Sequence, residues 1–135
     1  MRILAIDLGD VRTGIAVSDL SGTLAGEAWI ITERDRDRLA EQIIAEATAR
    51  NVGQIVLGYP RNMDGTLGPR AEKSEVFKEK LESLTKLQVH LWDERRTSAE
   101  ADTILMNAGK RGKKKKQVLD AVAASLILDG YLRSL

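Results

Sequence analysis

The sequence predicts a single α/β domain built on a mixed five-stranded sheet with helices on both faces. The chain has 135 residues, the size of one ordinary domain. Three short apolar segments with brief connections open it, which indicates antiparallel strands. Strand and helix patterns then alternate, and such a succession favours parallel pairing with helices on both faces. Because no linker or repeat divides the chain, we expect one domain over residues 1–135.

The expected elements follow from hydrophobic spacing and from turn residues. Strands are expected at 2–8, 14–18, 27–32, 54–57 and 87–92. Helices are expected at 35–50, after Pro69 to about Leu84, at 97–107 and at 118–132. Residues 60–69 hold two prolines and two glycines and therefore predict a loop. Residues 109–116 are expected to separate the last two helices.

The composition excludes several classes of protein. Hydrophobic residues make up 43% and aromatic residues only 4%, so the core must be mainly aliphatic. The absence of cysteine excludes a disulfide scaffold, a thiol nucleophile and a thiolate metal site. No segment approaches the ~20 apolar residues of a membrane span, and the first apolar run is too short for a signal peptide. We therefore expect a cytoplasmic protein without a membrane partner.

Two candidate catalytic acids lie at expected strand ends. Asp7 ends the first strand, before Gly9, where an aspartate often only forms a turn. Glu94 follows the strand at 87–92, and its neighbourhood of acids and arginines also fits a surface ion-pair cluster. Carboxylates at strand ends of an α/β sheet, however, face the usual ligand crevice. Asp93 remains an alternative to Glu94, because the strand register decides which side chain faces the site.

Asp120 is the most informative acid. It lies in a nearly all-apolar helical segment, residues 118–128, and such a helix is buried on most sides. A lone carboxylate there is costly unless it is paired or binds a metal. The alternative is a carboxylate near the first turn, which the helix dipole would stabilise. We favour the functional interpretation.

If Asp7, Glu94 and Asp120 converge, they require a cation. Two carboxylates at ~4 Å repel each other by about 4 kcal/mol at an effective dielectric of ~20. A set of oxygen ligands favours Mg²⁺ or Mn²⁺ over zinc. Such a site can activate water and stabilise the leaving oxygen of a phosphodiester. The three acids are therefore the predicted catalytic residues and metal ligands.

A basic cluster precedes Asp120 directly. The net charge is only +1, but six of the seven residues from Lys110 to Lys116 are basic. Such a cluster is typical either of nucleic-acid binding or of a solvated loop. The predicted contacts with the phosphate backbone are Lys110, Arg111, Lys113, Lys114, Lys115 and Lys116.

Other residues fit structural roles better. His90 is the single histidine and lies in a strand, so we expect a ring packed on the sheet. Trp29 and Trp92 could stack on bases, but tryptophans on strands are more often part of the core. The loop at 60–69 ends at Arg70, before a helix, and it could contact phosphate at the helix N-terminus or simply connect two elements.

Four motifs in this order resemble the YqgF family across nearly the whole chain. They are Ala5–Gly9 followed by Gly14–Val17, Gly58–Thr66, Asp93–Thr97, and Asp120 before an alanine-rich helix. The family is described as Holliday junction resolvase-like and as a nuclease for the precursor of small-subunit ribosomal RNA. The resemblance implies a ribonuclease H-like fold, with Asp7, Glu94 and Asp120 at the positions of its acidic triad. It also places Arg95 and Asn62 near that site. Tyr59 and Arg61 depart from the usual apolar residues around Pro60.

These observations favour a metal-dependent hydrolase, a nuclease acting on structured nucleic acid. RNA, in particular precursor ribosomal RNA, is the favoured substrate. A resolvase of branched DNA is the first alternative, and it would need a homodimer with two active sites. A non-catalytic factor in ribosome assembly or transcription is the second. The sequence by itself does not distinguish RNA from DNA.

Overall fold

The computed structural model describes residues 1–22, 25–60, 68–93 and 112–135, with backbone alone at 25 and 112–120. Five strands form one mixed sheet in the order β3-β2-β1-β4-β5. They are β1 (Arg2–Asp7), β2 (Arg12–Ser18), β3 (Ala25–Thr32), β4 (Val52–Tyr59) and β5 (Gln88–Asp93). The first three pair antiparallel, and β4 lies parallel to both β1 and β5. The predicted mixed five-stranded sheet is confirmed.

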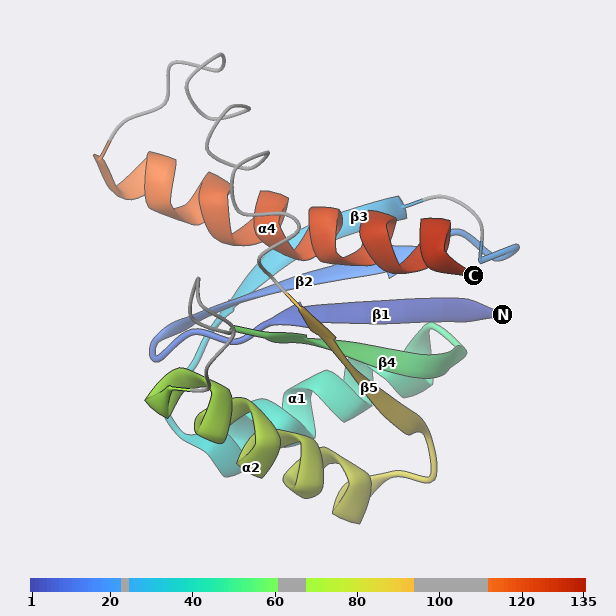
Figure 1. The fold of residues 1–135 in the computed structure, drawn as a ribbon, viewed down its shortest axis with the longest axis horizontal. Coiled ribbons are helices and arrows are strands. Elements are labelled where there is room, and N and C mark those ends of the chain that lie inside the picture. The colour runs from blue at the N-terminus through green and yellow to red at the C-terminus, as the bar shows by residue number, and fades with distance from the viewer. Residues whose placement is uncertain (23–24, 61–67, 94–111) are drawn as a thin grey trace.

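Helices cover both faces of this sheet, as predicted (Figure 1). The helices α1 (Arg36–Ala49) and α2 (Pro69–Leu84) lie on one face, and α4 (Gly112–Ser134) crosses the other. Alternation of side chains along each strand therefore fills two separate cores. In β1, Leu4 and Ile6 belong to the core between the sheet and the helices α1 and α2. Ile3 and Ala5 belong to the core between the sheet and α4.

The two cores are aliphatic, as the composition requires. The larger core contains the fully buried Leu39 and Ile43 of α1, together with Phe77 of α2. The core below α4 is thinner, because Ala5 and Ala16 meet Ala124 there, and all three are at most 1% exposed. Small side chains on the sheet and on the helix let α4 lie close to the sheet.

One predicted boundary is wrong. Residues 109–116 were expected to interrupt the helical pattern, but α4 already begins at Gly112, so Lys113–Lys116 form its first turns. The glycines suggested a break, yet lysine is a good helix former and four in a row extend the helix toward its N-terminus. The helix expected at 97–107 lies outside the described residues.

The loop between α2 and β5 and the turn between α1 and β4 complete the parallel crossovers.

At the start of α1, the Asp35 carboxylate accepts hydrogen bonds from the backbone N–H groups of Asp37 (2.9 Å) and Arg38 (3.1 Å). These bonds lower the pKa of Asp35 and cap the N-terminus of α1, which lies at the carboxyl edge of the sheet.

None of the helices in the described ranges, α4 included, carries a stretch both long and apolar enough to cross a bilayer.

Candidate active site and a neighbouring cationic pocket

Asp7 lies where the topology predicts a ligand crevice. Because β1, β4 and β5 are parallel, their last residues, Asp7, Tyr59 and Asp93, share one edge of the sheet. The N-terminal ends of α2 and α4 lie toward the same edge (Figure 1). Ligands of open α/β sheets bind at this carboxyl edge.

Asp7 and Asp120 belong to the same side of the sheet. Asp7 follows Ile3 and Ala5 at the two-residue spacing of a strand, so it lies on the face that α4 covers. Asp120 lies in α4, one helical turn before Ala124, which is buried against that face. Asp7 and the backbone of Asp120 therefore lie on the same side of the sheet.

The register of β5 bears on the choice between Asp93 and Glu94. Val89 and Leu91 pack into the core below α1 and α2, whereas Trp92 packs against α4. By the same alternation, Asp93 lies on the α1 and α2 face, opposite to Asp7. This placement argues against Asp93 as the partner of Asp7.

The other predicted site residues fall into two groups. Glu94, Arg95, Asn62, Lys110 and Arg111 are not among the described residues. The backbones of Lys113, Lys114, Lys115, Lys116 and Asp120 belong to α4. Among the side chains that are described, no three could hold one metal ion. The acids at this edge carry oxygen donors only, and that donor chemistry fits Mg²⁺ or Mn²⁺.

The turn after Asp7 depends on a glycine. The Gly9 N–H donates to the hydroxyl of the fully buried Thr13 (3.3 Å), which closes the connection between β1 and β2. A Cβ atom on Gly9 would lie only 1.9 Å from the Arg12 carbonyl oxygen. No side chain fits at this position unless the turn that follows Asp7 opens.

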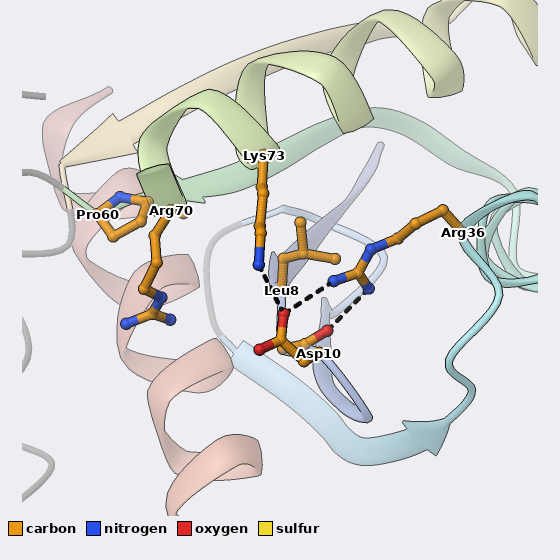
Figure 2. A pocket seen from close by; sticks show the side chains of 8 residues that line it. Leu8, Asp10, Arg36, Pro60, Arg70 and Lys73 are labelled. Carbon is orange, nitrogen blue, oxygen red and sulfur yellow. Dashed lines mark hydrogen bonds and ion pairs between the residues drawn. The ribbon is translucent and has the colours of Figure 1, made fainter. Parts of the chain in front are cut away.

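Beside this turn the structure forms a pocket of about 140 Å³, which we call the cationic pocket. Its walls are Leu8, Gly9, Gly58 and Pro60, from the ends of β1 and β4. Its charged residues are Asp10, Arg36, Arg70 and Lys73. Figure 2 shows Arg36 reaching in from the start of α1, and Arg70 and Lys73 from the start of α2.

Asp10 is the one acid among the residues that line the cationic pocket. Its carboxylate forms ion pairs with the Lys73 ammonium (3.3 Å) and the Arg36 guanidinium (3.5 Å). Arg36 also donates to the Gly9 carbonyl oxygen (2.8 Å) and so braces the turn. The Lys73 ammonium and, less strongly, Arg36 and Arg70 lower the pKa of Asp10.

This shift predicts a pH dependence. The folded-state pKa of Asp10 lies below its usual 3.8, so its contribution to stability is complete above that value and disappears as the pH falls through the folded-state pKa. We expect Asp10→Asn to lose less unfolding free energy than wild type on acidification from about pH 5 to about pH 2.5. Urea unfolding at several pH values measures this difference, and parallel curves would contradict it.

The sequence did not point to the cationic pocket. Arg70 stood out as a residue that follows a loop, but Arg36, Lys73 and Asp10 did not. A signal existed, because Arg36, Arg70 and Lys73 all lie in the first turns of helices, where the helix dipole disfavours positive charge. Only the tertiary fold shows that these two helix ends meet.

The aromatic residues belong to the packing, as expected for strand residues. His90 stacks on Tyr131 of α4, with ring centroids 5.7 Å apart, and Trp92 meets the same ring edge-on. The Arg50 guanidinium carbon lies over the Trp29 ring, 4.3 Å from the centroid of that ring. The expectation that His90 packs on the sheet is confirmed.

Comparisons with known proteins agree with the fold. The "RuvX: Holliday junction resolvase" family model matches residues 1–134. A relative from Lachnospira eligens, named "Putative pre-16S rRNA nuclease", is 44% identical and covers 99% of this chain and 98% of its own length. Many of the other curated relatives carry the same name.

Two solved structures show the same fold at low sequence identity. RuvC of T. thermophilus, in complex with a Holliday junction substrate, superposes with a TM-score of 0.64 at 12% identity, covering 99% of this chain and 96% of RuvC. The Fowlpox virus resolvase, with Holliday junction DNA, gives 0.60 at 15% identity, covering 99% and 98%. The predicted ribonuclease H-like fold is confirmed. The chain therefore belongs to the RuvX family, the family of YqgF-like proteins that the four sequence motifs predicted, and the names of its relatives support a nuclease, a hydrolase that acts on phosphodiester bonds.

Proposed function

We propose that the protein is a metal-dependent nuclease that hydrolyses phosphodiester bonds in structured nucleic acid, with the precursor of small-subunit ribosomal RNA as its substrate. Asp7, Glu94 and Asp120 are the proposed catalytic residues and ligands of Mg²⁺ or Mn²⁺. The proposal rests mainly on one observation: Asp7 ends β1 on the sheet face covered by α4, the helix that carries Asp120. A cytoplasmic location is part of the same proposal.

The chemistry of these residues follows from their type. A divalent metal bound by carboxylates would activate water and stabilise the charge that develops on the phosphate. The three acids would supply the negative charge that binds the metal. None of them needs to accept a proton for that role. Asp93 lies on the opposite face of the sheet from Asp7, which supports Glu94 as the third ligand.

Nucleic-acid binding is proposed for the basic residues next to the acids. Lys113, Lys114, Lys115 and Lys116 begin α4, and the first turn of this helix contains no acidic residue. Positive charge at a helix N-terminus is unfavourable until an anion binds there. Backbone phosphates are suitable anions, and Lys110, Arg111, Arg95 and Asn62 are proposed to extend this binding surface.

The comparisons favour two substrates for the proposed nuclease. The names of the relatives favour precursor ribosomal RNA, whereas the family description and the resolvase structures favour branched DNA. A resolvase acts on two strands and would require a symmetric homodimer, so oligomeric state separates the two functions. A protein that remains monomeric at working concentration would favour RNA processing.

The deciding experiment compares three labelled substrates in Mn²⁺ with wild type and Asp120→Asn in parallel. The substrates are a fragment of precursor ribosomal RNA, an unstructured single-stranded RNA and a four-way DNA junction. We expect wild type to cut the precursor fragment fastest and Asp120→Asn to cut none of them detectably. Preference for the junction would select the resolvase.

A third outcome would contradict a nuclease. If neither protein cuts any substrate while both bind RNA, the acids are structural and the protein acts as a binding factor. In that case Lys113→Glu combined with Lys115→Glu should abolish function in cells, and Asp120→Asn should not.

A further inference from the structure

The cationic pocket lies next to Asp7 along the chain, but its charged residues come from the opposite face of the sheet. Leu8 and Gly9, which line it, directly follow Asp7 in the chain. Asp7 lies on the face of α4, whereas Arg36, Arg70 and Lys73 come from α1 and α2 on the opposite face. A nucleic-acid strand that crosses the carboxyl edge near Asp7 therefore passes this pocket.

The charges of the pocket suit an anion. Three cations and one carboxylate line it, so its lining carries a net charge of +2. Arg36 is committed to the protein itself, since it donates to the Gly9 carbonyl oxygen and pairs with Asp10. Arg70 forms no ion pair with any residue in the described ranges, and Figure 2 shows its side chain extending from the start of α2 past Pro60, with no dashed line to Asp10.

The start of α2 contributes as well. Its N-cap residue is Gly68, which has no side chain to accept from the first N–H groups, and Pro69 follows it. Arg70 and Lys73 occupy the first two turns, where they oppose the helix dipole, and Glu72 offsets only part of this charge. An oxyanion bound in the pocket would compensate both the dipole and the cations.

We propose that the cationic pocket binds a backbone phosphate of the nucleic-acid substrate through Arg70 and Lys73, next to the phosphate cleaved at Asp7. In the free protein Asp10 pairs with Lys73, and the bound phosphate takes the place of the Asp10 carboxylate. The proposal rests on the nuclease function proposed above. In the free protein the Asp10 carboxylate has the place of an oxyanion, between Lys73 and Arg36 (Figure 2). Its side chain is 78% exposed, so it can leave Lys73 at little cost.

The two parts of the proposal predict effects of opposite sign. Arg70→Gln and Lys73→Gln each remove a phosphate contact and should weaken binding about fivefold, while the salt slope for single-stranded RNA decreases by about 0.7. Asp10→Asn removes the competitor and should strengthen binding by about two- to fivefold. Asparagine also fits a turn, so the loop geometry is kept.

The test measures fluorescence anisotropy of a fluorescein-labelled single-stranded RNA in EDTA, at several salt concentrations. Lys86→Gln is the matched control for the cations, because it makes the same charge change beyond the far end of α2. Asp129→Asn is the control for Asp10, since Asp129 pairs with Arg133 near the end of α4. We expect both controls to bind as wild type does, with an unchanged salt slope.

Three results would overturn the proposal. The first is binding of Arg70→Gln and Lys73→Gln that equals that of Lys86→Gln. The second is an Asp10→Asn gain that persists in full when Lys73→Gln is also present, because the competition requires Lys73. The third is displacement of the RNA by ATP as efficient as displacement by an unlabelled oligonucleotide at equal phosphate concentration, which would indicate a nucleotide site.

Cleavage kinetics separate this proposal from the nuclease function itself. In Mn²⁺, Arg70→Gln should raise KM about fivefold and leave kcat nearly unchanged, because the pocket binds substrate away from the reacting phosphate. Unchanged KM with active wild type would overturn the phosphate subsite and leave the nuclease intact. Inactive wild type with pocket-dependent RNA binding would contradict the nuclease alone.

Discussion

Asp7→Asn is expected to reduce the rate of cleavage by about 10³-fold or more while the protein stays folded. The substitution keeps the size of the side chain and removes the negative charge that would bind the metal. Loss of several kcal/mol of transition-state stabilisation corresponds to this factor. Because neighbouring carboxylates repel each other, the metal-free protein should be no less stable after the change. Single-turnover cleavage of the preferred substrate in Mn²⁺ measures the effect.

Two neighbouring variants make this prediction specific. Asp93 ends β5 on the face opposite to Asp7, so Asp93→Asn should retain activity within about threefold of wild type, the size of a small surface effect. Glu94→Gln should lose activity as Asp7→Asn does. The reverse pattern would mean that Asp93 is the ligand and that the alternation along β5 does not continue to the site.

Thermal unfolding gives a readout that does not depend on catalysis. A metal that binds only the folded protein raises the midpoint of unfolding with its concentration. We expect Mn²⁺ to raise the midpoint of wild type and to leave that of Asp7→Asn nearly unchanged. Equal shifts in both proteins would place the metal elsewhere.

Gly9→Ala is expected to cause the largest loss of stability among single substitutions near the site. The new Cβ atom would lie 1.9 Å from the backbone oxygen of Arg12, so the turn between β1 and β2 must open. Overpacking against backbone typically costs 1–3 kcal/mol, and we expect about 3 kcal/mol here, because a carbonyl group cannot rotate away as a side chain does. For a domain of this size the melting temperature should fall by roughly 12 °C.

Gly53→Ala is the matched control. A Cβ at Gly53 would also collide, at 1.7 Å, but with the sulfur of Met1, which is the flexible end of an exposed side chain. Met1 can move aside, so this variant should change the unfolding free energy by less than about 1 kcal/mol. Urea unfolding of both variants measures the two effects. A loss below about 1 kcal/mol for Gly9→Ala as well would show that the turn at Gly9 tolerates a side chain.

The order of elements followed from the sequence, since it depends on local patterns. Apolar alternation and glycine turns indicated the three antiparallel strands, and helical spacing indicated α1, α2 and α4. The start of α4 was misplaced, because glycine at 112 was taken as a break although the following lysines favour helix. Asp7, Glu94 and Asp120 were selected from residue type and from the family motifs, and the convergence of their carboxylates is a prediction.

Tertiary structure decided what depends on strand register and on contacts distant in sequence. The face of the sheet on which Asp93 lies is set by the face that Val89 and Leu91 fill. The sequence shows that side chains alternate along β5, but only the packed strand shows which of them face which side. The cationic pocket joins Asp10, Arg36 and Lys73 across as many as 63 positions of sequence. No local pattern reports such proximity, because it arises only when the parallel crossovers bring the starts of α1 and α2 to the same edge of the sheet as Asp7.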